Sequence, residues 1–404
     1  MTDLIFPSRL DRLTPEIVTA LLAEQRHGVV VTQVKVIKSA HRGDGVASTA
    51  DRVTLDLEYA HDAGLPSRMV LKTVLLHRGL RFGPSAIQLT GKMLDVLGSM
   101  PLGSHLRPFV FSAIGAYQRR YPHAPDAMYI NEVRFYRTIR AHLAIEAPQC
   151  FGSIFDEKRR SFGVLMEDLT LRGARFPNAT MDLGLDEIGG LVATLAALHA
   201  RYWDDPSLRS DFRWLATPLS GGMAPVFQSL GLDLIRNQVE TNDYKAVLLE
   251  PLGRTVDELW ERLAHAQAIM ATGPQTLLHG DPHIGNTYLL PKGQGGFLDW
   301  QLMIRGRWAH DFAYLVITAL APEDRRKHER DLLRLYREGL ERGGVENPPD
   351  PNEAWLRYRQ AALWGLVIGW LITPTENYGE TITRANLVRL VTAVQDLETL
   401  QALA

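Results

Sequence analysis

The sequence predicts an α+β protein with two lobes, in which a small β-rich lobe precedes a larger, mainly helical one. The chain has 404 residues, which is too long for one ordinary hydrophobic core. β-branched runs separated by turn residues fill the region from Val29 to about Leu76. After Thr170 the apolar residues repeat mainly at helical spacing. We therefore expect a first domain over residues 1–169 and a second over 170–404.

Local patterns predict the elements of the first lobe. Thr14, Pro15 and Glu16 combine a capping hydroxyl, a first-turn proline and an acid near the positive end of the dipole, so a helix begins here. The runs "VVVTQVKVIKSA", "RVTLDLEYA" and "RMVLKTVLL" predict three antiparallel strands. A central helix over about 130–144 and a hairpin in "FGSIFDEKRRSFGVLMEDL" follow. Residues 77–127, rich in Gly, Pro and Ser, predict an insertion with short helices.

The second lobe is predicted to be helical around one short hairpin. In "LDEIGGLVATLAALHARYW" the apolar residues form the stripe of an amphipathic helix. Within residues 277–301, "TYLL" and "GGFLDW" flank the turn "PKGQGG", which predicts a β-hairpin with loops. Further helices are expected near residues 242–272, 308–320, 323–342, 353–373 and 385–403.

Composition and charge exclude several classes of protein. The formal net charge of −2 argues against a protein that works mainly by holding nucleic acid phosphates. The most apolar stretches, "DFAYLVITALA" and "LWGLVIGWLIT", are shorter than a bilayer span, so no membrane partner is expected. The single cysteine, Cys150, fits a reducing compartment, and the N-terminal stretch lacks a secretory signal pattern. We expect a cytoplasmic protein, monomeric or weakly dimeric.

Three oxygen-bearing side chains suggest phosphoryl-transfer chemistry. Asp281 and Asn286 lie in "LLHGDPHIGNTYLL", and Asp299 follows in "FLDWQ". Carboxylate and amide oxygens of this kind hold Mg²⁺, which usually shares its shell with a phosphate. Asn286 and Asp299 would bind the metal ion, and Asp281 would orient or deprotonate an attacking hydroxyl. The alternative is that these residues only cap turns, which Asp and Asn favour.

Upstream residues supply groups that a triphosphate needs. Gly43, Gly45 and Ser48 in "HRGDGVAS" could let backbone and hydroxyl donors approach phosphates, although hairpin turns also use glycine. Lys72 lies in the apolar run "MVLKTVLL", where a buried lysine needs a partner; an edge-strand lysine is the alternative. Glu132 is a candidate for that partner, unless it is an ordinary surface charge.

Two further patterns remain open. In "VLMEDL" the lobe ends where a hinge would present backbone groups to an adenine ring, although Glu167 and Asp168 could equally be solvated linker charges. His279 and His283 flank Asp281 as H-x-D-x-H, a pattern that suits Zn²⁺ in a metal-dependent hydrolase. Such an enzyme would need at least one further ligand, and the remaining histidines are scattered.

These segments resemble a known family. "HGDPHIGN" with "LDWQ" is similar to the signature of the aminoglycoside phosphotransferase and choline kinase superfamily, which has the protein-kinase-like fold. "VLKTV", "NEVRFYRTI", "VLMEDL", "LAALHARYW" and "HDFAYLVITAL" resemble more closely its ecdysteroid-kinase-like branch, found in insects and with bacterial relatives. The resemblance covers about residues 29–400.

The resemblance implies a role for each matching position. Asp281 would be the catalytic base, Asn286 and Asp299 the Mg²⁺ ligands, Lys72 the phosphate-binding residue and Glu132 its ion-pair partner. Asp311 in "HDFAYL" would brace the catalytic segment. ATP would be the phosphate donor, its phosphates covered by Gly43, Gly45 and Ser48 and its adenine met by Met166, Glu167 and Leu169. The sequence departs from protein kinases in lacking a third loop glycine and in having "DWQ" in place of D-F-G.

The predicted acceptor is a hydroxylated small molecule. Enzymes that phosphorylate polycationic antibiotics should line their acceptor site with carboxylates, and residues 350–404 contain no dense acidic cluster. They contribute Trp355, Tyr358, Trp364 and Trp370 instead, which favours an apolar alcohol, phenol or steroid-like acceptor if part of this stripe is not plain core. The alternatives are an aminoglycoside phosphotransferase, a nucleotide-binding pseudokinase and the metal-dependent hydrolase.

Overall fold

The computed structural model describes residues 6–7, 9–40, 50–74, 127–156, 161–291 and 293–404. The chain forms two compact units. The first comprises Met1–Thr138 and Gln149–Asp168, and the second comprises Ile139–Pro148 and Leu169–Ala404. Within the described residues, the first unit is built on a β-sheet and the second is mainly helical, so the predicted α+β fold class is confirmed.

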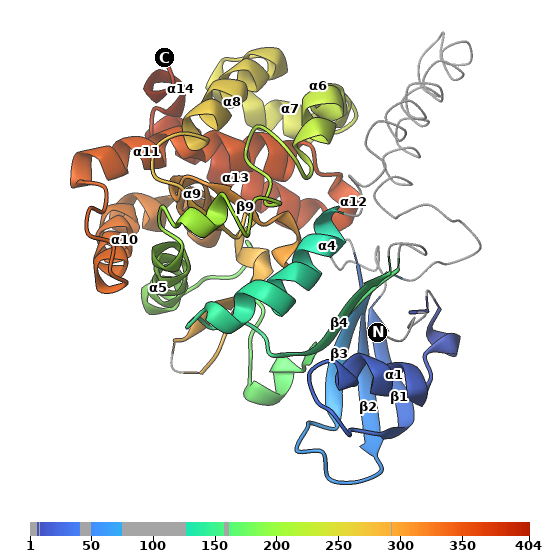
Figure 1. Cartoon of the computed structure of the whole chain (residues 1–404). Helices are drawn as coiled ribbons and strands as arrows, with labels where there is room; N and C mark the ends of the chain where they lie inside the picture. Colours follow the sequence, from blue (N-terminus) through green and yellow to red (C-terminus); the bar gives the residue numbers. More distant parts are fainter. Residues whose placement is uncertain (1–5, 8, 41–49, 75–126, 157–160, 292) are drawn as a thin grey trace. The chain divides into compact units, whose positions relative to one another are not determined.

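A five-stranded antiparallel sheet forms the centre of the first unit (Figure 1). The spatial order is β1-β2-β3-β5-β4, with every neighbouring pair antiparallel, as the sequence predicted. Alternation explains the sheet: β2 buries every second residue from Asp51 to Leu57. The strands are β1 (Val31–Ala40), β2 (Asp51–Tyr59), β3 (Arg68–Thr73), β4 (Cys150–Asp156) and β5 (Ser161–Glu167).

Helix α1 (Pro15–Ala23) packs on the edge strands β1 and β4. It approaches β4 so closely that a Cβ atom added at Gly152 would lie 2.4 Å from the carbonyl oxygen of Leu21. Glycine at position 152 therefore lets the helix backbone rest on the strand. Cys150 begins β4, and burial raises the pKa of its thiol to about 12.

The predicted central helix is present but changes its winding. Helix α4 (Ala127–Arg134) contacts β4 and β5. It continues as a π-helical turn over Phe135–Ile139 and a 3-10 turn over Arg140–His142. The α-helical part is therefore shorter than the predicted 130–144.

The second unit contains the helices that the sequence predicted and two that it did not. Helices α6 and α12 were missed, and the predicted helix over 242–272 is divided at Gly253, whose φ of +58° ends the first part. The predicted 353–373 helix is α-helical to Trp364 and π-helical over Gly365–Leu371. The helices are α5 (Leu185–Arg201), α6 (Ala224–Glu240), α7 (Asp243–Leu249), α8 (Val256–Met270), α9 (Ala309–Ala319), α10 (Pro322–Arg342), α11 (Pro351–Trp364), α12 (Thr375–Tyr378), α13 (Glu380–Asp396) and α14 (Thr399–Ala402).

Two short antiparallel ladders hold the loop around Asp281. Strands β7 (Thr287–Leu289) and β8 (Gly295–Phe297) form the predicted hairpin. Strand β6 (Thr276–Leu278) precedes this hairpin in the sequence and strand β9 (Ile304–Gly306) follows it. The two strands pair with each other, and neither was predicted. Helix α5 contacts both β6 and β8, and it packs on α9 and α10 as well. The loop between β6 and β7 is therefore anchored at both ends.

No helix among the described residues is both long enough and apolar enough to cross a membrane.

Candidate active site

Lys72 and Glu132 form a buried ion pair in the first unit. Lys72 lies on β3 and Glu132 on α4. The Lys72 Nζ atom lies 2.7 Å from Glu132 Oε2 and donates to Oε1 at 2.9 Å, with side chains only 3% and 1% exposed. The pair that the resemblance implied is therefore present, and Lys72 is not an exposed edge residue. Two charges buried together must satisfy each other, because either one alone would be costly.

The residues predicted to meet an adenine lie where the two units divide. Met166 and Glu167 end β5, and Leu169 begins a 3-10 turn over Leu169–Arg172. Glu167 is occupied locally, because its backbone N–H donates to Gln149 O and its carboxylate accepts from Gln149 N at 2.8 Å. Leu169 is buried against Tyr288. The side chain of Glu167 thus ties β5 to the start of β4.

The predicted phosphate loop cannot be placed. Gly43, Gly45 and Ser48 lie outside the described residues, as does nearly all of the predicted insertion over 77–127.

Asp311 braces the loop that carries Asp281. Its carboxylate accepts hydrogen bonds from His279 N at 2.6 Å and Gly280 N at 3.0 Å. Gly280 has a φ of +85°, and a Cβ atom there would lie 1.9 Å from Leu302 O, so the turn requires glycine. The brace implied by the resemblance is confirmed.

A second layer of hydrogen bonds fixes Asp311 itself. His199 Nε2 lies 3.2 Å from Asp311 Oδ2, and His199 Nδ1 lies 2.7 Å from Tyr336 Oη. Burial opposes ionisation of Asp311, but the hydrogen bond and charge of His199, with those of nearby histidines, outweigh it and lower the pKa of Asp311. Asp311 is thus stabilised as a carboxylate.

Asp281 and Asn286 are brought together by the short turn between β6 and β7. The Nδ2 atom of Asn286 donates to the backbone oxygen of Asp281 at 2.9 Å and to its Oδ2 atom at 3.0 Å. Both bonds use the amide nitrogen, and no hydrogen bond to the amide oxygen occurs among the described residues. That oxygen is the atom a hard cation would use.

The surroundings of Asp281 disfavour the ionised form of its carboxyl group. Burial, and after it the negative charge of Asp299, raises the pKa of Asp281 well above its ordinary value, although a hydrogen bond from Asn286 opposes the rise. The side chain nonetheless keeps 22% of its surface exposed. Asp299 follows β8 with a φ of +64°, which is rare for a residue with a side chain and is typical of functional sites. The structure therefore brings Asp281, Asn286 and Asp299 into one site.

Both histidines of the H-x-D-x-H segment are engaged by neighbours. The Nε2 atom of His279 lies 2.8 Å from Leu298 O, and its Nδ1 atom accepts a hydrogen bond from Asp281 N at 3.3 Å. His283 accepts from Gly285 N at 3.1 Å and lies 3.4 Å from the Tyr378 hydroxyl. Within the described residues, no three His, Cys, Asp or Glu side chains form a metal-binding group. The ring nitrogens serve the loop, so the geometry does not favour the hydrolase alternative.

An aromatic cluster surrounds His283 beside Asp281. The rings of Tyr314, Trp370 and Tyr378 lie 5.6–5.8 Å from the His283 ring, centroid to centroid. Tyr314 also forms a hydrogen bond with Asp281 that opposes the rise in the pKa of that carboxyl. Burial, followed by the charge of His279, lowers the pKa of His283 to about 3, so this ring is neutral at ordinary pH. The surroundings of Asp281 are therefore largely uncharged and aromatic on this side.

The predicted aromatic stripe divides between this cluster and the core. Trp370 belongs to the cluster, and Trp364 packs on Tyr314 and His310. Trp355 lies under the guanidinium of Arg330, and the hydroxyl of the fully buried Tyr358 donates to Glu329. Sequence reasoning missed Tyr314 and Tyr378. Tyr314 could have been found one turn after Asp311 on the predicted helix, whereas nothing in the sequence points to Tyr378.

A comparison with protein families defines the class of protein to which this α+β chain belongs. The sequence profile of the phosphotransferase enzyme family matches residues 115–349, more than half of the chain. The chain belongs to this family. The matched range includes Asp281, Asn286 and Asp299, and it begins after Lys72.

The solved structures to which the chain is similar include several small-molecule kinases. A spectinomycin phosphotransferase in complex with ADP and spectinomycin is 10% identical, with a TM-score of 0.46 and coverage of 96% of this chain and 99% of that one. A choline kinase from Cryptosporidium parvum is 12% identical, with a TM-score of 0.47 and 96% of both chains covered. A Plasmodium vivax ethanolamine kinase is also 12% identical, with a TM-score of 0.45 over 89% of this chain and 81% of that one. No curated protein sequence matches the chain significantly.

Proposed function

We propose that the protein is an ATP- and Mg²⁺-dependent kinase that transfers the γ-phosphoryl group to a hydroxyl of a small molecule. The observation that carries this proposal is the state of Asp281. Its pKa is raised by burial and by Asp299, while Asn286 holds its carboxylate in place. A raised pKa makes a carboxylate a better acceptor for the proton of an attacking hydroxyl. Family membership supports the same reaction class.

The metal site would be formed by Asn286 and Asp299. Mg²⁺ is commonly bound by one or two protein oxygens, with water and phosphate completing its shell. The residues fit this ion, because the Asn286 amide oxygen makes no hydrogen bond within the described residues and Asp299 places negative charge beside Asp281. When bound, the ion would neutralise charge on the transferring phosphoryl group.

The nucleotide would be bound by the first domain, residues 1–169. Lys72 would contact the phosphates while Glu132 fixes its ammonium group, as their buried ion pair suggests. Met166, Glu167 and Leu169 would meet the adenine, and Gly43, Gly45 and Ser48 would cover the phosphates. Residues 170–404 would carry the catalytic loop and the acceptor site.

The acceptor is proposed to be an apolar alcohol, a phenol or a steroid-like molecule, as in the ecdysteroid-kinase-like branch. Tyr314, Trp370 and Tyr378 gather around a neutral His283 next to Asp281. Aromatic rings bind apolar acceptors well, whereas a polycationic aminoglycoside would need several carboxylates in their place. The half-buried Tyr378 is the member of the cluster nearest to solvent.

The test is a screen for acceptor-dependent ADP formation. Purified protein is incubated with ATP, with or without Mg²⁺, and with panels of steroids, phenols, simple alcohols, amino alcohols, sugars and aminoglycosides. We expect turnover with apolar acceptors only when Mg²⁺ is present, and strongly reduced turnover in the Asp281→Asn variant. Turnover with aminoglycosides alone would refute the apolar acceptor.

The pseudokinase alternative requires a different result. Lys72, Asp281, Asn286 and Asp299 are all present, which disfavours a protein that only binds nucleotide. Nucleotide binding without turnover against every panel would favour it. A cytoplasmic location and a monomeric or weakly dimeric state stay predictions.

A further inference from the structure

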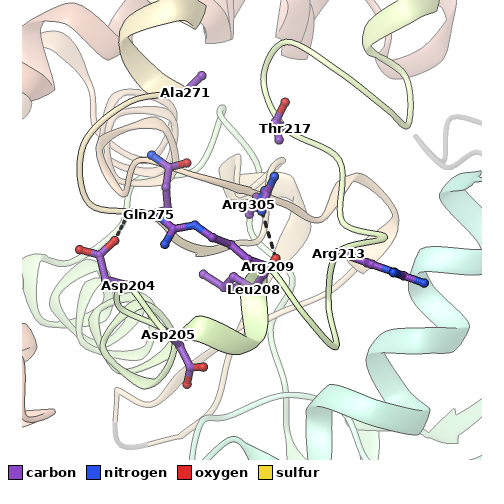
Figure 2. Close-up of a pocket in the computed structure, with 9 residues that line it drawn as sticks. All are labelled: Asp204, Asp205, Leu208, Arg209, Arg213, Thr217, Ala271, Gln275 and Arg305. Carbon is purple, nitrogen blue, oxygen red and sulfur yellow. Dashed lines mark hydrogen bonds between the residues drawn. The ribbon is translucent and has the colours of Figure 1, made fainter.

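We propose that a pocket in the second unit binds a small anion with a carboxylate or phosphate group. The pocket has a volume of about 420 Å³, which lies in the range of small-molecule sites. None of the residues that line it belongs to the proposed catalytic or nucleotide-binding set. They are Asp204, Asp205, Leu208, Arg209, Arg213, Thr217, Ala271, Gln275 and Arg305 (Figure 2).

The positive charges of this pocket lack carboxylate partners. Within the described part of the chain, Arg209, Arg213 and Arg305 form no ion pair with Asp or Glu, unlike many other arginines of the protein. Arg305 is also half-buried, where an uncompensated charge costs more than at the open surface. The three guanidinium groups are therefore available to bind an anion from outside the chain.

The two acidic residues of the pocket are already engaged. Asp204 Oδ1 accepts from Gln275 N at 2.8 Å. Asp205 accepts from Ser207 N at 2.8 Å and from Arg201 Nη1 at 3.2 Å. Its hydrogen bonds to Ser207, and after them the hydrogen bond and charge of Arg201, lower the pKa of its carboxyl. These carboxylates hold loops in place and do not neutralise the lining arginines.

Arg305 is fixed in a position from which it can bind a ligand. Its backbone N–H donates to Ala216 O at 2.9 Å, and its Nη1 atom donates to Leu208 O at 3.1 Å. That bond uses one of five guanidinium N–H groups, so most donors remain for a ligand. A held guanidinium suits planar carboxylate or phosphate oxygens, since less side-chain freedom is lost on binding.

The side chains differ in their direction. Figure 2 shows Arg209 extending toward Gln275 across the pocket, with Arg305 close by, whereas Arg213 extends away from both. Arg209 and Arg305 are therefore the main anion-binding residues of the proposal. The amide of Gln275 adds a neutral donor, and the Thr217 hydroxyl lies at the edge.

The pocket borders the strands that lead to the proposed catalytic loop. Gln275 stands directly before β6, which continues into His279 and Gly280. Arg305 lies in β9, opposite Leu277 of β6. A bound anion would therefore contact β9 and the residue that directly precedes β6, while leaving Asp281 itself untouched.

The experiment measures anion binding by the full chain with isothermal titration calorimetry. Inorganic phosphate and succinate are titrated separately, against chloride at matched ionic strength, with saturating ADP present to occupy the proposed nucleotide site. We expect at least one anion to bind to the wild-type protein. A preference for phosphate or for succinate would then identify the class of ligand. Absence of binding for both anions up to about 10 mM would overturn the proposal.

Variants locate the binding. Loss of one charge-assisted contact should weaken binding about ten- to a hundredfold in Arg305→Ala and in Arg209→Glu, which also places a carboxylate next to Arg305. Arg209 is exposed, so Arg209→Glu should fold normally. Arg213→Ala should weaken binding less, and Arg334→Ala, an exposed arginine of α10, should leave it unchanged. Unchanged binding in Arg209→Glu would show that the anion binds elsewhere.

Discussion

Asp281 lies in the loop between β6 and β7, and Asp311 braces that loop, yet the pKa values of the two carboxyl groups are shifted in opposite directions. Asp311 accepts two backbone N–H groups and pairs with His199, so its pKa is lowered. Asp281 faces Asp299 and a largely aromatic surrounding, so its pKa is raised. The neighbours of two chemically identical side chains therefore shift their pKa values in opposite directions. Asp311 is a fixed carboxylate that shapes the loop, and the raised pKa of Asp281 suits its proposed role as proton acceptor.

The largest expected effect separates these two aspartates by activity. Asp281→Asn should lower kcat by about 10²–10⁴-fold, because a general base contributes about this much. Its free energy of unfolding at neutral pH should stay equal or rise, since a carboxyl with a raised folded-state pKa destabilises the fold above that pKa. Steady-state kinetics and urea unfolding test both parts. Retained turnover would remove Asp281 from catalysis.

The matched substitution Asp311→Asn should act on stability. The substitution replaces one carboxylate oxygen with an NH₂ group, so the side chain can no longer accept from both His279 N and Gly280 N. It also removes the negative charge beside His199. We expect a loss of about 3 kcal/mol in the free energy of unfolding at pH 7. Because the folded-state pKa of Asp311 is lowered, its contribution should disappear as pH falls through that pKa. Equal free energies of unfolding for Asp281→Asn and Asp311→Asn would contradict the proposed difference between the two aspartates.

His283 should make the fold sensitive to mild acid. Its folded-state pKa of about 3 lies below the ordinary value of 6.5, so the unfolded chain binds more protons between these values. The stabilising contribution is present above pH 6.5 and falls as pH drops, by about 2 kcal/mol at pH 5. Urea unfolding from pH 5 to 8 measures it. His283→Gln should flatten this dependence, while the same change at the exposed His265 should not.

The smallest expected effect concerns the acceptor side of Asp281. Tyr378→Leu should raise the KM for an apolar acceptor less than tenfold, because one half-buried aromatic contact contributes about 1 kcal/mol. The value of kcat should change little. Trp355→Leu, outside the aromatic cluster, is the matched control. An equal rise in KM in that variant would show that Tyr378 has no specific role in acceptor binding.

Local patterns explain how much of the fold could be predicted. The strands of the first unit have clear alternation, and the β7–β8 turn is adjacent in sequence, so both were found. The three-residue strands β6 and β9 have no pattern of their own and form only by pairing across the loop. Helix α6 was missed because Gly231 in its interior weakens its helical signal. Tertiary packing explains that glycine, since a Cβ atom at Gly231 would lie 2.4 Å from the Trp260 ring.

The candidate site was predictable to the extent that its residues are close in sequence. Asp281 and Asn286 lie in one short turn, and that turn places them together. The Lys72–Glu132 contact joins β3 to α4 across 60 residues of sequence, so the residues alone left an ordinary surface charge as the alternative for Glu132. Tyr378 meets His283 from a distant helix, so the partner could not be read from either segment alone.

The state of Cys150 has a practical consequence for labelling. It is the one cysteine in the sequence, and its thiol, with a pKa raised to about 12, is almost entirely protonated near pH 7. Maleimides and similar reagents attack the thiolate, so this position should react slowly. A cysteine introduced at an exposed position could therefore carry a fluorophore or spin label without first replacing Cys150, and ligand binding could be followed by spectroscopy in otherwise native protein.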